Sequence, residues 1–149
     1  MSLEQEIKQE KFGNEFEKMA INILFTASWI YNLNASRLKP LGISPEQFNV
    51  LRILRGSRPK PLMLVDITCR MIDKSSNATR LVEKLRQKGL VKREICEHNR
   101  RQVDISITDK GLGILKQIDT ESESWIETLK SVTKGEAQEI NRILDKLRG

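Results

Sequence analysis

The amino-acid sequence predicts a mainly α-helical protein with one small β hairpin, an α+β fold in which residues 1–149 form a single domain. Two observations predict this fold class. Apolar residues recur every three or four positions over most of the chain, which is typical of helices that pack on one face. Alternation of apolar and polar residues, which is typical of a strand, is clearest at Val103–Ile107.

Both ends of the chain predict helices that are longer than a small domain needs to cover its own core. Residues 4–38 carry an apolar stripe and contain no proline. Residues 109–131 and 134–147 carry similar stripes. We therefore expect a central lobe over about residues 40–111 and a helical lobe over about residues 4–38 and 112–149.

The first helix of the central lobe has three start signals. Ser44 can cap free backbone amides, Pro45 suits the first helical position, and Gln47 completes a capping box. We expect this helix to end near Arg55. A short helix is predicted over residues 62–71, and its core-facing residues are expected to be Leu62, Val65, Ile67 and, at its end, Cys69.

A second helix and a hairpin are predicted in the rest of the central lobe. The helix covers residues 74–88, and Asp73 is its expected cap. Strands are predicted over residues 90–96 and 103–107. The polar residues 97–102 between them are expected to form the hairpin tip.

The formal net charge of +6 is concentrated in one part of the chain. Between Arg70 and Arg101, ten basic residues outnumber four acidic ones, so this segment carries the entire net charge. An evenly solvated surface would spread its charge. Such a concentration is instead typical of a protein that binds a polyanion such as nucleic acid.

Within that segment, the predicted helix over residues 74–88 has two contrasting faces. Its core face carries Ala78, Leu81, Val82 and Leu85. The first two turns of the other face are small and hydrogen-bonding, which permits close approach to base edges and phosphates in a major groove. The candidate DNA-binding residues of this helix are Lys74, Ser75, Ser76, Asn77, Thr79 and Arg80. Taken alone, the pattern is equally typical of an amphipathic surface helix.

The predicted hairpin tip carries Arg100 and Arg101, with no carboxylate directly beside them. Exposed charges contribute little to stability, so a functional reason is favoured over a solvated turn. An arginine on a protruding ribbon can enter a narrow minor groove, where the negative potential is strongest. Lys92 and Arg93 are expected to contact backbone phosphates. The candidate DNA-binding residues of the hairpin are therefore Lys92, Arg93, His98, Asn99, Arg100 and Arg101.

Residues 44–111 resemble the MarR family of winged helix-turn-helix regulators. The resemblance rests on Ser44–Leu51 at the start of a helix, on Lys74–Leu85 in the predicted recognition helix, and on Lys88–Arg93 at the entry to the hairpin, or wing.

The wing also follows the family pattern D-x-R followed by L-T-x-x-G, with Arg101 ahead of Thr108 and Gly111. Two positions depart from it. Ile107 replaces the usual leucine, and Asn99 replaces the acidic residue that orients the wing arginine. Asn99 can still accept a hydrogen bond from Arg101, so the minor-groove role of Arg101 is kept with a weaker pairing.

The resemblance implies a winged helix-turn-helix fold with long N- and C-terminal dimerisation helices that interlock in a homodimer. It also implies a sequence-specific transcriptional regulator, expected to be a repressor. Such a dimer binds a pseudo-palindromic operator in double-stranded DNA through two recognition helices about one helical turn apart. The residues expected at the dimer interface are Phe12, Phe16, Trp125, Leu129, Ile140 and Leu144.

Members of the family often respond to small aromatic or amphipathic effectors, or to oxidants. An effector pocket is expected between the dimerisation helices and the central lobe, with Trp29, Tyr31 and Phe48 as candidate wall residues. Aromatic residues at helical spacing are, however, more often part of a core. The oxidant-sensing branch places its cysteine near the start of the first helix, where this sequence has none. Cys69 and Cys96 leave a thiol-based redox-responsive regulator as an alternative.

The sequence indicates no catalytic chemistry. It has no phosphate-binding glycine loop, metal-ligand cluster or nucleophile elbow, and His98 is its only histidine, so we expect no enzyme, metal or cofactor. The most apolar stretch, Ala20–Ile30, is too short for a bilayer, and the acidic N-terminus is unlike a secretory signal. A cytoplasmic protein with no membrane contact is expected. A winged-helix module that docks proteins without specific DNA binding is the alternative function.

Overall fold

The computed structural model describes all 149 residues and confirms the predicted fold class, mainly α-helical with one two-stranded antiparallel sheet. In chain order the elements are α1 (Leu3–Ile7), α2 (Glu15–Leu38), the 3-10 helix η1 (Lys39–Leu41), α3 (Pro45–Ser57), α4 (Leu64–Arg70), α5 (Ala78–Gln87), β1 (Val91–Cys96), β2 (Asn99–Ile107), α6 (Asp109–Thr120), α7 (Ser122–Glu127) and α8 (Lys134–Arg148). None of the helices is both long and apolar enough to cross a bilayer.

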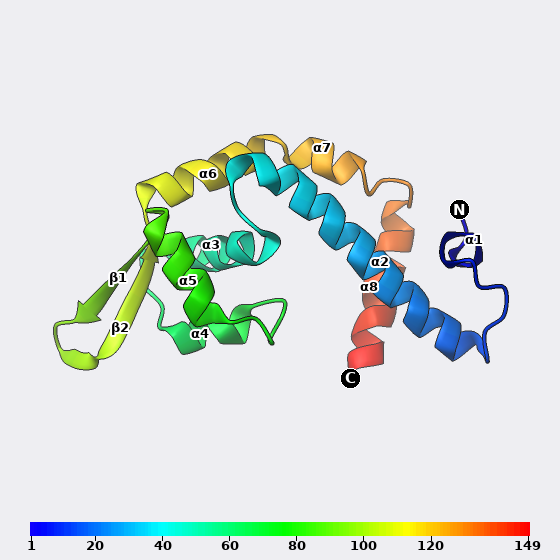
Figure 1. Ribbon diagram of the computed structural model, residues 1–149, viewed down its shortest axis with the longest axis horizontal. Helices are drawn as coiled ribbons and strands as arrows, with labels where there is room; N and C mark the ends of the chain where they lie inside the picture. Colours follow the sequence, from blue (N-terminus) through cyan, green and yellow to red (C-terminus); the bar gives the residue numbers. More distant parts are fainter.

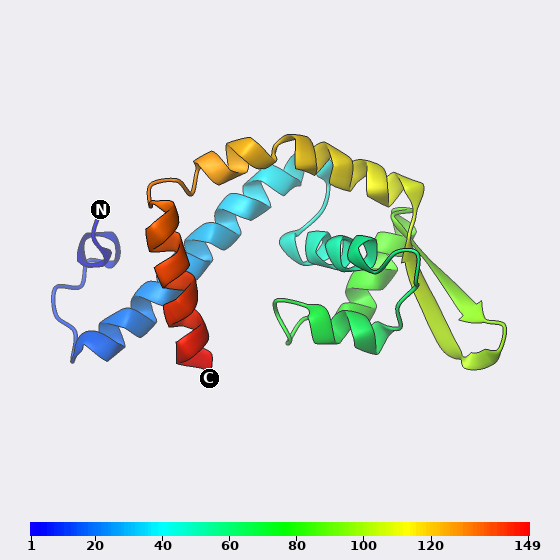
Figure 2. The same cartoon turned by 180° about the vertical axis from the view of Figure 1, so that it is seen from behind.

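The molecule is elongated, and its two ends differ in structure (Figure 1). At one end α3, α4 and α5 lie together, and the β1–β2 hairpin projects beyond them. Both termini lie at the other end, with α1 and α8. The view from behind shows that two routes connect the ends, the long helix α2 and the α6–α7 pair, and that these routes diverge toward the termini (Figure 2).

The hydrophobic core lies at the hairpin end. A cluster of 18 buried residues forms it, and all of them lie between Leu38 and Ile118. We call this part of the chain the winged lobe (residues 38–118). By contrast, α8 buries no residue and α2 buries only its last one. Because burial of apolar surface is the main favourable term in folding, the winged lobe supplies most of the folding free energy of the single chain.

Local signals set the starts of α3 and α6. The predicted capping box is present, because Ser44 Oγ accepts a hydrogen bond from the Gln47 N–H at 3.1 Å and Gln47 Oε1 accepts one from the Ser44 N–H at 3.1 Å. Thr108 Oγ1 accepts a hydrogen bond from the Gly111 N–H at 3.1 Å in the first turn of α6.

The N-terminal helix is interrupted, so the prediction of one helix over residues 4–38 is wrong. Asn14 caps α2, because its Oδ1 accepts a hydrogen bond from the Glu17 N–H at 2.9 Å. The asparagine side chain competes for backbone groups, and the neighbouring Gly13 disfavours a helix. The local cap therefore overrides the apolar periodicity.

The prediction of a single helix over residues 109–131 is also wrong, because this segment is divided into α6 and α7. At the C-terminal end of each of these two helices, a threonine hydroxyl donates a hydrogen bond to a backbone carbonyl. Thr120 Oγ1 donates to Gln117 O at 2.6 Å, and Thr128 Oγ1 donates to Trp125 O at 2.6 Å. Such bonds compete with continuation of a helix.

The helix α4 is shorter than the one predicted over residues 62–71. Leu62 pairs instead with Ile105 at the edge of the sheet, donating to Ile105 O at 2.9 Å and accepting from the Ile105 N–H at 2.8 Å. Leu62 is buried as predicted, whereas Val65 and Cys69 are exposed, contrary to the prediction. Each of these two residues lies two positions from the buried Ile67 on α4, which places its side chain on the opposite face of the helix.

Candidate nucleic-acid interface

The predicted recognition helix begins later than expected. α5 starts at Ala78, and its cap is Asn77 rather than Asp73, because Asn77 Oδ1 accepts a hydrogen bond from the Arg80 N–H at 3.1 Å. Residues 74–76, which were predicted to be helical, form a turn ahead of α5.

Asp73 closes that turn instead of capping the helix. Its Oδ1 accepts hydrogen bonds from the Ser75 N–H at 2.9 Å and from the Ser75 hydroxyl at 2.6 Å. These bonds stabilise the carboxylate and lower the pKa of Asp73 below its ordinary value. Lys74 Nζ donates to Cys69 O. In the free protein Lys74 and Ser75 therefore hold the turn in shape.

The helix α5 separates a buried face from an exposed polar face. Ala78, Val82 and Leu85 are buried, as predicted. Thr79 and Arg80 are exposed in the first turn, which is the part of a recognition helix that approaches base edges.

Lys84 also lies on the exposed side of α5, although it was not among the predicted site residues. It lines a hollow of about 410 Å³ together with Ser76, Asn77 and Arg80. Its position four residues after Arg80 places both cations on one side of the helix. That spacing is the sequence signal that could have indicated it.

The wing has a longer second strand and a shorter tip than predicted. β2 begins at Asn99 rather than at Val103, so only Glu97 and His98 form the tip. Residues 99–102 were predicted in the tip and lie on the strand instead.

The register of the two strands changes near the tip. Ile95 pairs with Val103, but the next residue, Cys96, pairs with Asn99. Residues 100–102 are therefore extra on β2 and form a bulge. A bulge bends its strand and redirects side chains, here those of the two predicted wing arginines.

Asn99 contacts Arg101 differently from the predicted pairing, which would have oriented the arginine side chain. Asn99 Oδ1 accepts from the Arg101 backbone N–H at 3.1 Å. Asn99 therefore holds the backbone of the bulge, and the Arg101 guanidinium keeps its donors free.

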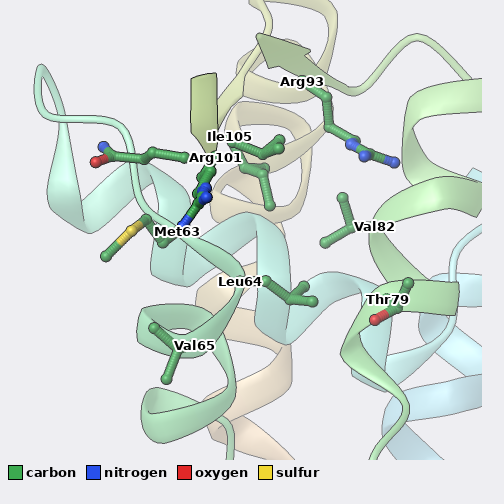
Figure 3. A pocket seen from close by; sticks show the side chains of 10 residues that line it. Met63, Leu64, Val65, Thr79, Val82, Arg93, Arg101 and Ile105 are labelled. Atoms are coloured by element: carbon green, nitrogen blue, oxygen red, sulfur yellow. The ribbon is translucent and has the colours of Figure 1, made fainter. Parts of the chain in front are cut away.

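The wing and the recognition helix meet at a hollow of about 320 Å³. Figure 3 shows Thr79 and Val82 on the α5 side, with Arg93 and Arg101 coming from the strands. Ile105 lies among them, and the lining is largely apolar. The structure thus brings together Thr79, Arg93 and Arg101, which come from the two predicted DNA-binding segments.

Intramolecular ion pairs neutralise some cations of this surface and leave others without a carboxylate partner. Lys92 Nζ lies 3.3 Å from Glu94 Oε1, and Arg93 Nη1 lies 3.8 Å from Glu83 Oε2. The cations of α5 and the wing that take part in none of the eight ion pairs of the chain are Arg80, Lys84, Arg100 and Arg101.

A second hollow, of about 470 Å³, lies between α2, α3 and residues 71–73. Tyr31 and Phe48 line it, as predicted, and the Tyr31 hydroxyl donates to Glu46 Oε1 at 2.8 Å. This hydrogen bond to a carboxylate raises the pKa of Tyr31. Trp29 is not part of its wall, contrary to the prediction. Trp29 lies two positions before Tyr31 on α2, which turns its side chain to the opposite face of the helix.

The helices outside the winged lobe leave apolar side chains uncovered in the single chain. Phe16 on α2 is 79% exposed and Ile140 on α8 is 46% exposed. The other residues predicted at a dimer interface are half-buried, namely Phe12, Trp125, Leu129 and Leu144.

Known proteins are similar to this chain in both sequence and fold. Residues 43–103 match the MarR family. The chain is 32% identical over 99 residues to the HTH-type transcriptional regulator MhqR of Bacillus subtilis (strain 168), covering 66% of this chain and 67% of that protein. It is 30% identical over 109 residues to the HTH-type transcriptional regulator MgrA of Staphylococcus aureus, covering 73% and 72%.

Among solved structures, a mutant of MarR from E. coli complexed with operator DNA has the same fold. The TM-score is 0.81 at 24% identity, with 93% of this chain and 99% of that chain covered. The fold, with a recognition helix beside a basic wing, is that of the winged helix-turn-helix transcription regulators. The chain belongs to the MarR family, whose members are transcription regulators rather than enzymes.

Proposed function

We propose that this protein is a cytoplasmic repressor that binds a pseudo-palindromic operator in double-stranded DNA as a homodimer. The observation that carries the proposal is the set of cations on α5 and the wing that have no acidic partner. Exposed charges stabilise a fold little, whereas cations that meet phosphates release bound counterions and favour binding to DNA. These unpaired cations are Arg80, Lys84, Arg100 and Arg101.

Each element has a distinct part in this proposal. The first turn of α5 enters a major groove, where Thr79 and Arg80 meet base edges. The turn at residues 74–76 lies along the sugar-phosphate backbone of the DNA beside that groove. Arg101 enters the flanking minor groove, while Lys92 and Arg93 contact phosphates. The bulge held by Asn99 sets the reach of Arg100 and Arg101, and His98 lies beside the DNA at the tip.

We assign dimerisation to the long helices of residues 4–38 and 112–149, and DNA binding to the lobe over residues 40–111. The exposed apolar side chains of α2 and α8, such as Phe16 and Ile140, support this division. An uncovered apolar surface on a chain of this size is typical of an interface. A two-fold dimer presents two recognition helices to one face of the duplex, so its site has two related halves.

A small aromatic or amphipathic effector is proposed to release the protein from DNA. The hollow of about 470 Å³ beside Tyr31 and Phe48 supports this assignment, because it is within the size range of small-molecule sites. Its wall includes Ile72 and Asp73, which directly precede the turn ahead of α5. An occupant would therefore contact both α2 and the segment that leads into the recognition helix.

Selection of bound duplexes from a random DNA pool tests the proposal. We expect an enriched motif with two inverted half-sites, and an affinity that falls steeply with salt. Arg101→Ala should reduce the slope of log affinity against log salt by about 2, because the dimer loses two cations from the DNA surface, one from each protomer. A pool without any enriched motif would reject the repressor and favour a module that docks proteins.

A further inference from the structure

Glu83 on α5 is the acidic residue that connects the recognition helix to the wing. Its carboxylate accepts hydrogen bonds from Arg86 Nε at 3.0 Å and Arg86 Nη2 at 2.6 Å, both within α5. It also lies 3.8 Å from Nη1 of Arg93 on β1. Among the eight ion pairs, this contact is the one that joins α5 to β1.

Arg86 holds the carboxylate of Glu83 in one orientation. The two hydrogen bonds go to different oxygen atoms, so the guanidinium and the carboxylate form a two-pronged pair, which restricts rotation of both groups. The hydrogen bonds from Arg86 also lower the pKa of Glu83, which favours its charged form. Arg93 thus lies at ion-pair distance from a carboxylate of fixed direction.

The ion pair with Glu83 orients Arg93 and leaves most of its N–H donors unused. The contact with Glu83 involves only Nη1, whereas a guanidinium has five N–H donors. Its side chain extends from the strand toward α5 (Figure 3) and lines the hollows on both sides of the α5–wing junction. The remaining donors are available to a phosphate.

The presence of Glu83 on this surface calls for a physical reason. A carboxylate beside DNA repels the phosphate backbone, and an exposed ion pair contributes little to folding. We propose that Glu83 is a positioning residue, which holds Arg93 between β1 and α5 so that wing and recognition helix present their cations to the DNA backbone at a fixed spacing. This inference rests on the proposed DNA-binding function.

The test compares two carboxylates whose replacement is expected to change DNA affinity in different ways. Glu83→Gln preserves the shape of the side chain and removes its charge. On the duplex enriched with the wild-type protein, it should weaken binding about two- to fivefold for each protomer, and the salt slope of the dimer should fall by about 2 because both protomers lose the Arg93 contact. Glu94→Gln is the matched control, since Glu94 pairs only with Lys92 of its own strand. Losing that charge should leave the affinity unchanged or raise it, with no smaller slope.

A double-mutant cycle tests whether Glu83 acts through Arg93. In an Arg93→Ala background, Glu83→Gln should no longer weaken binding. Thermal unfolding of Glu83→Gln should match that of the wild type, which separates positioning from stability. The inference is overturned if Glu83→Gln tightens binding as Glu94→Gln does, or if it weakens binding equally in the Arg93→Ala background. If the wild-type protein itself selects no duplex, the repressor proposal fails first.

Discussion

At the scale of single residues, neighbouring side chains on the exposed surface of α5 are expected to have different roles in DNA binding. Thr79 is exposed on the first turn of α5 and lines the hollow shared with the wing. Lys84 lies one turn later and contacts no carboxylate. A short hydroxyl side chain can report the identity of a base, whereas an ammonium group senses mainly the phosphate charge.

Replacement of these two residues should separate base-specific recognition from electrostatic attraction to the phosphates. Thr79→Ala should cost about 1–3 kcal/mol at particular base pairs of the operator and leave other positions unaffected. Lys84→Ala should weaken binding to all duplexes alike and reduce the salt slope. Binding measured against a set of single-base operator variants distinguishes them. Equal losses on every variant for Thr79→Ala would show that Thr79 contacts only the backbone.

Two glycines of α6 differ in what surrounds them. A Cβ on Gly111 would contact Leu90 O and would lie 2.7 Å from Ile107 Cγ1, whereas a Cβ on Gly113 would meet nothing within 4 Å. Gly111→Ala should therefore destabilise the fold by about 1–3 kcal/mol through overpacking. Gly113→Ala should stabilise it by about 1 kcal/mol through helix propensity. Denaturant unfolding of both variants gives the comparison, and equal stability would contradict the close packing of α6 on the wing base.

At the scale of elements, local hydrogen bonds set where the helices begin. Asn77 and Asp73 both have side chains suited to cap a helix, and the structure uses Asn77 as the cap and Asp73 in the turn. The apolar periodicity of residues 78–85 was correctly assigned from the sequence. The start of α5 was not, because two competing caps four residues apart leave the periodicity unchanged.

Loss of the α5 cap should affect both stability and DNA binding. Asn77→Ala removes the acceptor for the Arg80 N–H and should cost about 1 kcal/mol. Amide exchange in the first turn of α5 should become faster, and operator affinity should fall. Asn141→Ala on α8 is the control, since that side chain is exposed within a helix. If the two variants have the same stability, Asn77 is not an effective cap.

At the scale of the whole molecule, the hydrophobic core occupies only one end of the structure. Its core is confined to the winged lobe, while α8 lies outside that core without burying a residue. Apolar periodicity indicated these long helices from the sequence. That they divide at Asn14 and after Thr120 depended on local side-chain bonds that the periodicity does not encode.

A charge placed on the apolar side of α8 should prevent dimerisation. Ile140 is 46% exposed in the single chain, so Ile140→Glu should leave the winged lobe folded and yield monomers with weakened operator binding. Gln138→Glu, on the other side of the helix, should stay dimeric. Light scattering gives the mass of each variant. An Ile140→Glu protein that remains a dimer would refute this interface.

The sequence by itself determined the fold class, the Ser44 capping box, the buried face of α5 and the concentration of charge between Arg70 and Arg101. These features follow from nearest-neighbour chemistry and periodicity, which are written along the chain. Only the tertiary structure decided the bulge at residues 100–102 and the meeting of Glu83 with Arg93. Both depend on how strands register and on which side chains of separate elements come within reach, and sequence spacing encodes neither.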